Sequence, residues 1–171
     1  MVDSRELIPN AKVTKHSLPY ECPDIYLDDH IMSLKFSPTQ NILSIGQITG
    51  ELRLYTYDHE ATNQQLLFNH HTESVRSIDY SPDGKILYSA SADHSISVVS
   101  MGRLEGHMKS CHKEAVNKIR HIENSHVIAT GDDDGCVKIW DLRAAAEGKK
   151  ACVIEFNEHE GTVTDMDYHE D

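Results

Sequence analysis

The chain has 171 residues, the length of a single domain, and its 39% hydrophobic and 26% charged residues exclude a wholly disordered or collagen-like polypeptide. Its 28 acidic residues against 16 basic ones give a formal net charge of −12. Because proteins grip a phosphate backbone with clustered Lys and Arg, this balance argues against direct nucleic-acid binding and favours basic protein partners.

Residues 1–23 have little periodicity, so we expect a mobile arm or the donor of an edge strand there. Residues 1–10 lack the apolar run of a signal peptide, and no stretch approaches the roughly 20 apolar residues of a membrane helix. The four cysteines lie far apart, which favours a reduced, intracellular compartment. No membrane association is expected.

An internal repeat begins after this segment. Residues 33–38 (SLKFSP) return as residues 77–82 (SIDYSP), 44 residues later. A second pair of segments has the same interval, because residues 52–55 (LRLY) return 44 residues later as residues 96–99 (ISVV). Two landmarks in register indicate a duplicated structural unit.

The spacing continues along the chain. Residues 75–78 (VRSI) match residues 116–119 (VNKI), and residues 96–99 match residues 137–140 (VKIW), both 41 residues later. A further copy opens at residues 163–166 (VTDM), 47 residues after its counterpart at 116.

Each copy is predicted to contain four strands, because short β-rich runs alternate with turn residues. In the second copy the expected order is a strand at 75–80, a turn at 81–84, a strand at 86–90, a hairpin at 93–94, a strand at 95–100 and a short return strand from 102. In the third copy Asp134-Gly135 suits the hairpin. Residues 144–150 are predicted to be an inserted loop, which explains the longer interval that follows.

Four-stranded units with a period of about 40 to 45 residues are typical of propeller blades. The sequence therefore predicts an all-β fold, a partial β-propeller with about three and a half four-stranded blades of a seven-bladed parent. The blades are expected at residues 24–69, 70–110 and 111–157, with the start of a fourth at 158–171. We interpret the chain as a fragment or truncated gene product whose open edges favour self-association.

The third copy carries a specific resemblance. Residues 127–141 read VIATGDDDGCVKIWD, and His112 precedes the first strand of this copy. This segment resembles a WD repeat. The resemblance implies a hydrogen-bonded structural tetrad made of His112, Thr130, Asp134 and Trp140. Such a buried chain would fix the blade geometry, since an unpaired polar member costs about 1 to 3 kcal/mol.

The second copy matches the tetrad in part. His71, Ser89 and Asp93 correspond to its first three members. Val99 stands at the Trp position and offers no indole N–H. Within the WD-repeat proteins, residues 24–27 (DIYL) and 129–133 (ATGDD) are similar to one branch, that of WD-repeat protein fifty-five and the fungal Jip-five proteins. This likeness implies a nucleolar role in ribosome biogenesis and rRNA processing.

The 12 histidines raise the question of a metal site. The neighbouring pairs are His70 with His71, His107 with His112, and His121 with His126. A structural zinc site needs Cys and His at tight paired spacings, whereas His71 and His112 recur once per blade. We therefore expect no metal site and no cofactor.

Other chemistry is also disfavoured. Residues 132–135 resemble a calcium loop, with Asp141 six residues after the glycine, but the first ligand would be Thr130 and the flanks are strands. The sequence has no nucleophile elbow, no phosphate-binding glycine loop and no metalloprotease motif. Ser89, His71 and Asp93 are interpreted as a structural network. No enzymatic activity is expected.

Residues 140–143 (WDLR) match a pattern by which some WD-repeat proteins dock on the adaptor of a cullin-RING ubiquitin ligase. In that role Asp141 and Arg143 would be the exposed contacts. The alternative is that Trp140 belongs to the core and Arg143 pairs with a neighbouring carboxylate.

A propeller displays rigid loops at its faces, so function is expected there. The candidate contact positions, which precede or open the first strand of each copy, are Leu27, His30, Ser74, Ala115 and Thr162. The first hypothesis is a non-catalytic scaffold in the nucleus and nucleolus, with the cytoplasm as a further location, whose partners are pre-ribosomal assembly factors. The second is a substrate receptor that binds the ubiquitin-ligase adaptor.

Overall fold

The computed structural model describes residues 24–58, 61–123, 126–146 and 151–168. The arm expected at residues 1–23 and residues 147–150 of the expected loop lie outside these ranges. Within them the chain forms strands and one short helix, and no described helix has the length and apolarity needed to cross a bilayer.

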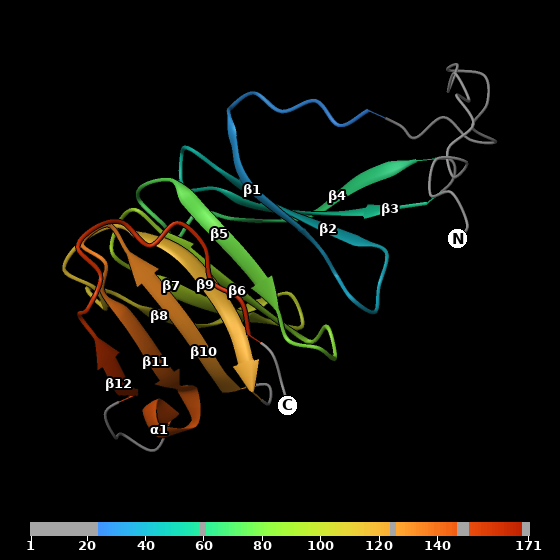
Figure 1. Cartoon of the computed structure of the whole chain (residues 1–171). Coiled ribbons are helices and arrows are strands. Elements are labelled where there is room, and N and C mark those ends of the chain that lie inside the picture. The colour runs from blue at the N-terminus through green and yellow to red at the C-terminus, as the bar shows by residue number, and fades with distance from the viewer. Residues whose placement is uncertain (1–23, 59–60, 124–125, 147–150, 169–171) are drawn as a thin grey trace, which may run out of the picture.

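The strands form three antiparallel sheets of four strands each, and in every sheet the chain order is also the spatial order (Figure 1). The first sheet consists of β1 (Ile31–Phe36), β2 (Ile42–Gln47), β3 (Leu52–Tyr57) and β4 (Thr62–Phe68). The second consists of β5 (Val75–Tyr80), β6 (Ile86–Ser91), β7 (Ile96–Ser100) and β8 (Arg103–Met108). The third consists of β9 (Val116–Glu123), β10 (Val127–Asp132), β11 (Val137–Asp141) and β12 (Cys152–Phe156).

The sheets are arranged as neighbouring blades. Strand β5 contacts both β1 and β9, so the first strands of the three sheets lie side by side. The remaining strands of each sheet extend away from this row, as Figure 1 shows. The expected all-β partial propeller is confirmed.

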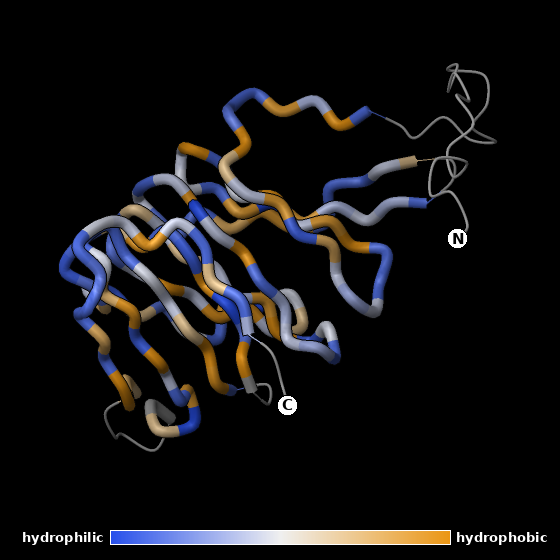
Figure 2. The backbone as a smooth tube through the Cα atoms, in the orientation of Figure 1, coloured by the Kyte–Doolittle hydropathy of each residue, from blue (hydrophilic) through white to orange (hydrophobic). Residues whose placement is uncertain are grey.

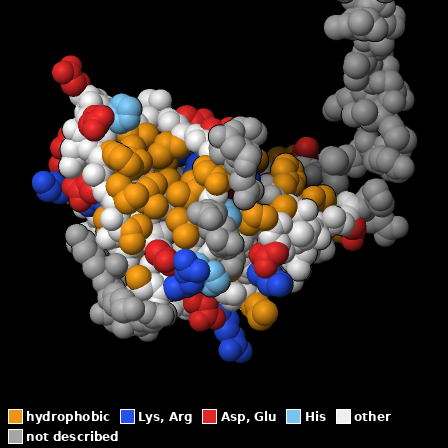
Figure 3. Space-filling view, turned by 60° about the horizontal axis from the view of Figure 1, so that its bottom comes forward, with side chains coloured by type: hydrophobic (Ala, Val, Ile, Leu, Met, Phe, Trp, Pro, Cys, Tyr) orange, Lys and Arg blue, Asp and Glu red, His pale blue; other side chains and the backbone are white. Residues whose placement is uncertain are grey.

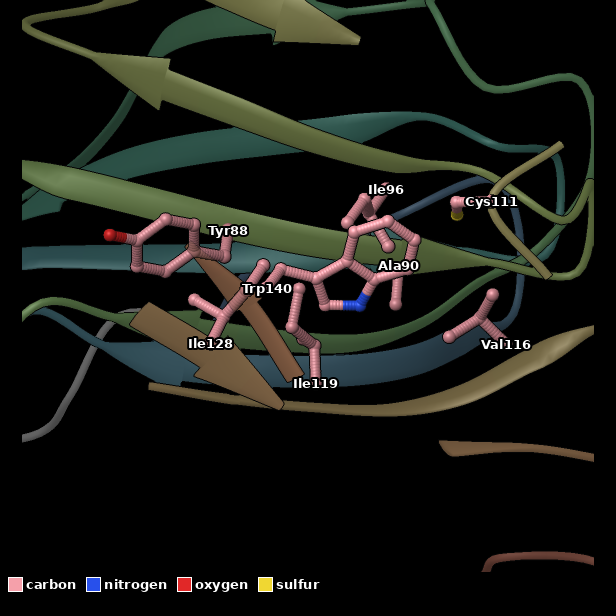
Figure 4. Packing of buried hydrophobic residues seen from close by; sticks show 8 residues of the cluster. All are labelled: Tyr88, Ala90, Ile96, Cys111, Val116, Ile119, Ile128 and Trp140. Atoms are coloured by element: carbon pink, nitrogen blue, oxygen red, sulfur yellow. The ribbon is translucent and has the colours of Figure 1, made fainter. Parts of the chain in front are cut away.

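Two apolar layers hold the blades together, and they appear as orange stretches on facing strands in Figure 2. Between the first and second sheets, Leu52 and Val75 are fully buried in one cluster. Between the second and third, Trp140 packs with Tyr88 and Ile128 (Figure 4). Side chains of a strand alternate between the two faces of its sheet. The side chains of one face therefore pack against the preceding sheet, and those of the other face pack against the following sheet.

A valine at the start of one blade meets a small residue of the preceding blade. A Cβ on Gly46 would lie 2.6 Å from Val75 Cγ1, and a Cβ on Gly131 would likewise meet Val163. Val163 thus repeats the packing of Val75, as the sequence repeat requires. Residues 157–168 form no strand, so the described part of the fourth copy contributes this contact without a sheet of its own.

One prediction about the third blade needs correction. Residues 144–146 were expected to begin a loop, but they complete a short helix, α1 (Leu142–Ala146). The run of three alanines explains the difference, since Ala has the highest helix propensity.

Apolar side chains remain exposed on the outer sheets. Met32, Leu34 and Phe36 alternate along β1 and are 44%, 55% and 53% exposed. On the third sheet, Ile154 and Phe156 of β12 are 48% and 45% exposed. Hydrophobic side chains gather in one broad area of the face seen in Figure 3. Exposed apolar side chains of this kind, on β1 and on β12, are typical of a surface that packs against another protein layer.

Candidate functional site

A buried hydrogen-bond chain organises the third blade. His112, which lies just before β9, contacts Thr130 Oγ1 of β10 through Nε2 at 2.6 Å. The indole Nε1 of Trp140 in β11 donates to the same oxygen at 2.7 Å. The other imidazole nitrogen, Nδ1, contacts Asp132 Oδ2 at 2.8 Å. Four side chains from one loop and two strands are thereby fixed relative to one another.

The carboxylate of this chain is Asp132, so the sequence prediction of Asp134 is wrong. Asp134 is exposed in the hairpin, and its backbone N–H donates to Asp132 Oδ1 at 3.1 Å. Asp132 is 1% exposed. It follows Thr130 by two positions in the same strand, and side chains two apart in a strand point to the same face. Alternation in the sequence excludes Asp133 but not Asp134, and Asp134 is excluded because it lies in the hairpin after β10 has ended.

The second blade holds a related network without an indole. His71 Nε2 contacts Ser89 Oγ at 2.8 Å, and His71 Nδ1 lies 3.3 Å from Asp93 Oδ2. Where the third blade has Trp140, Val99 is buried in the apolar layer. The Ser89 hydroxyl pairs instead with Ser97 Oγ at 2.6 Å. Ser97 therefore replaces the missing indole N–H as the partner of the central hydroxyl.

Burial keeps the two network histidines neutral. Burial lowers the pKa of His71 to about 4, although Asp93 acts in the opposite direction. Burial also lowers the pKa of His112, against the opposing hydrogen bond to Asp132. Each contact is therefore a hydrogen bond between a neutral imidazole and a carboxylate, and the network links the loop before each blade to the strands of that blade.

The candidate contact positions fall at equivalent places in the three blades. The carbonyl oxygens of His30, Ser74 and Ala115 accept N–H groups from the end of the second strand of their own sheet, at 3.0, 3.0 and 3.1 Å. Thr162 joins the same row, because its Oγ1 donates to Asp133 O at 3.1 Å. Leu27 lies half-buried in the segment that precedes β1. We call the loops that carry these positions the rim: residues 24–30, 70–74, 92–95, 111–115, 132–135 and 157–162.

The rim is acidic. Its exposed carboxylates include Asp28, Glu73, Glu114, Asp134, Glu158 and Glu160. Lys113 is the sole Lys or Arg in these loops. The surface that carries the candidate contacts is therefore negatively charged. It would attract a positively charged partner.

The WDLR segment divides between core and surface. Trp140 is 6% exposed and belongs to the apolar layer. Arg143, on α1, pairs with Asp141 through Nε to Oδ1 at 2.9 Å and Nη2 to Oδ2 at 2.8 Å. The hydrogen bonds from Arg143 hold the pKa of Asp141 below its usual range. The Arg143 side chain is 56% exposed, so its guanidinium is accessible while it is held in place.

Comparison with known proteins identifies the class. The family model "WD domain, G-beta repeat" matches residues 62–100 and 99–141. The chain belongs to the WD-repeat family of β-propeller proteins, whose members are typically non-catalytic and mediate protein interactions.

Two curated relatives place the chain more closely. It is 33% identical over 146 residues to "WD repeat-containing protein 55 homolog" of Drosophila erecta, a match that covers 84% of this chain and 28% of the relative. It is 35% identical over 151 residues to "WD repeat-containing protein 55" of Arabidopsis thaliana, covering 86% of this chain and 41% of the relative. The resemblance to this branch is confirmed, and the chain spans less than half of the length of either relative.

Among solved structures, the chain is similar to Sqt1 of Chaetomium thermophilum, with a TM-score of 0.69 and 23% identity over 77% of this chain and 35% of that one. A second structure, of the same protein bound to the N-terminus of the ribosomal protein L10, gives a TM-score of 0.68 and 22% identity over the same shares of the two chains. At this identity the likeness shows the fold.

Proposed function

We propose that the rim is a rigid docking surface for protein segments, and that the chain acts as a scaffold in ribosome biogenesis and rRNA processing. Its location would be the nucleus and nucleolus, with the cytoplasm as a second site. The observation that carries the proposal is the equivalent anchoring of His30, Ser74 and Ala115 through backbone hydrogen bonds of 3.0 to 3.1 Å.

Rigid anchoring suits a docking function. A surface that is already ordered loses little conformational entropy on binding, so more of the contact energy appears as affinity. His71 and His112 are buried members of the rim loops, three residues before the contact positions Ser74 and Ala115. The network geometry thus determines how the rim is displayed.

The charge of the rim indicates the chemistry of the partner. Exposed carboxylates such as Glu73, Glu114 and Asp134 would attract a Lys- and Arg-rich segment and would repel a phosphate backbone. Ribosomal proteins and pre-ribosomal assembly factors carry such basic segments. The structural neighbour bound to the N-terminus of a ribosomal protein, and the sequence relatives named WD repeat-containing protein 55, support this choice of partner.

Affinity purification of the tagged chain, followed by sedimentation of pre-ribosomal particles, tests the proposal. The wild-type chain should co-sediment with the particles, and the double variant Glu73→Lys/Glu114→Lys should be lost from them. Glu105→Lys, an exposed position on the outermost strand β8, is the matched control and should behave like wild type. A chain that is wholly cytoplasmic, or a rim variant that still co-sediments, would contradict it.

A second candidate function is supported by Arg143. Its guanidinium is both accessible and fixed by Asp141, which is the arrangement a docking contact requires. As a substrate receptor of a cullin-RING ubiquitin ligase, the chain would bind the adaptor in pull-down experiments. Arg143→Ala should abolish that binding and leave the circular dichroism spectrum unchanged, whereas Arg103→Ala on β8 should retain it. Absence of adaptor binding by the wild-type chain excludes this function.

A further inference from the structure

Two adjacent histidines and a third that lies 36 residues after His71 come together at the edge of the second blade. The rings of His70 and His71, in the loop before β5, lie 4.3 Å apart between centroids. The ring of His107, on β8, is 5.2 Å from each of them. Asp93, in the hairpin between β6 and β7, faces the same point. The sequence spacing gave no reason to expect this cluster.

The donor atoms of this cluster converge. His71 Nδ1, His107 and a carboxylate oxygen of Asp93 each offer a ligand atom, and these atoms all lie within 4.8 Å of one another. The 3.3 Å between His71 Nδ1 and Asp93 Oδ2 is close to the separation of about 3.3 to 3.5 Å between two ligands of a tetrahedral zinc ion. The Ser95 hydroxyl lies between the groups, 2.9 Å from His71 Nδ1 and 2.8 Å from His107 Nε2.

His70 provides an independent indication. Both of its ring nitrogens are buried and have no hydrogen-bond partner within the described part of the chain. A buried, unsatisfied polar group costs about 1 to 3 kcal/mol and calls for a bound water or ion. Its ring lies beside those of His71 and His107, so this unsatisfied side chain belongs to the same cluster.

The geometry points to a zinc site formed by His71, Asp93 and His107, with the fourth position of the ion left for a water molecule. Two imidazole nitrogens and one carboxylate suit Zn²⁺, and the carboxylate offsets half of the charge of the ion. Ser95 would rotate its hydroxyl aside as the ion enters.

The surroundings already orient these ligands. His71 Nε2 contacts Ser89 Oγ at 2.8 Å, which leaves Nδ1 for the ion. The Asp93 carboxylate accepts the N–H groups of Thr72 at 2.9 Å and of Ser95 at 3.0 Å. Such outer contacts fix the direction of a ligand and strengthen metal binding. The ion would tie the loop before β5, the β6–β7 hairpin and the outermost strand β8 into one unit.

Zinc titration of the EDTA-treated 171-residue chain against a chromogenic chelator tests this site. We expect one Zn²⁺ per chain, a higher melting temperature with zinc, and an affinity at least about tenfold lower in His107→Gln. His30→Gln, an exposed histidine outside the cluster, is the control and should bind as wild type does. Co²⁺ should give the absorption spectrum of a tetrahedral complex in the wild-type chain and in His30→Gln, and not in His107→Gln.

A variant at Ser95 separates a metal site from a purely structural network. Ser95→Ala removes the hydroxyl that joins the histidines, so it should lower the melting temperature in EDTA, and zinc should restore it. Equal zinc binding by wild type and by His107→Gln would overturn the proposal. A cobalt spectrum identical to that of the hydrated ion, or a Ser95→Ala chain that zinc does not restabilise, would do the same.

Discussion

Trp140 Nε1 donates a hydrogen bond of 2.7 Å to Thr130 Oγ1 between adjacent central strands of the third blade. In the second blade the equivalent partners are Ser89 and Ser97, at 2.6 Å. The two blades therefore satisfy the same buried hydroxyl position in different ways. One uses a large ring that also fills the apolar layer, and the other uses a second hydroxyl.

This relationship predicts the effect of Trp140→Phe. Phe retains most of the buried ring but has no N–H, so the variant should lose about 1 to 3 kcal/mol in free energy of unfolding from the lost hydrogen bond and the reduced volume. Thr130→Val should be destabilising as well. Urea denaturation of the two single variants and the double variant measures the coupling, and strictly additive effects would show that the bond contributes nothing.

The assignment of Asp132 to the network predicts a contrast with its neighbour. Asp132→Asn should destabilise the chain by about 1 to 3 kcal/mol, because it weakens buried hydrogen bonds to His112 and to the N–H groups of Asp134 and Cys136. Asp134→Asn is the matched control and should change the free energy of unfolding by less than about 0.5 kcal/mol. A larger loss of stability in Asp134→Asn than in Asp132→Asn would show that Asp134 is the carboxylate of the network.

The sequence predicted the architecture because the repeat interval determines it. Landmarks 44 and 41 residues apart carry the strand pattern, and each copy must bury one face against the next. The hydrogen-bond chain was predicted less completely. His112, Thr130 and Trp140 have recognisable side chains, but three consecutive aspartates at 132–134 offered three candidates, and only the direction in which each side chain points distinguishes them.

The histidine cluster could not be predicted from spacing. His107 lies 36 residues after His71, and the two meet because β8 returns along β7 and brings its C-terminal end beside the hairpin. Pairing register decides this contact, since His107 is opposite Ser97. A residue-by-residue register of the second blade would have been needed to find it.

The lowered pKa of His112 predicts a pH dependence. In the folded chain the imidazole stays neutral, whereas in the unfolded chain it takes up a proton with a pKa of about 6.5. The unfolded state therefore binds more protons below this pH, and the free energy of unfolding falls as the pH is lowered from about 7.5 to 5.5.

Urea titrations in EDTA at several pH values measure this slope. His112→Gln should lose part of it, up to about 1.4 kcal/mol per pH unit. The remainder comes from the other histidines whose pKa burial lowers, which are His70, His71, His107 and His121. An unchanged slope in His112→Gln would mean that His112 titrates normally in the folded chain.

The exposed apolar face of β1 leads to a prediction of self-association. Ser33 and Lys35 face the second sheet, where Ser33 Oγ donates to Val75 O at 2.9 Å and Lys35 pairs with Asp79 at 2.8 Å. Leu34 points the opposite way and is 55% exposed. We expect sedimentation velocity to show concentration-dependent dimers that Leu34→Lys weakens and Leu104→Lys, on the outermost strand, does not. A strictly monomeric wild-type chain contradicts this.

The hairpin of the third blade provides a test of how the fourth copy is anchored. Gly135 has a φ of 83°, and a Cβ there would lie 2.6 Å from His159 O and 2.7 Å from Gly161 O. Gly135→Ala should therefore destabilise the chain by about 1 to 3 kcal/mol through backbone strain and displacement of residues 159–161. Gly161→Ala is the matched control, because its Cβ would meet nothing within 4 Å. Thermal unfolding of both variants decides the matter, and equal melting temperatures would show that this contact does not hold the segment against the blade.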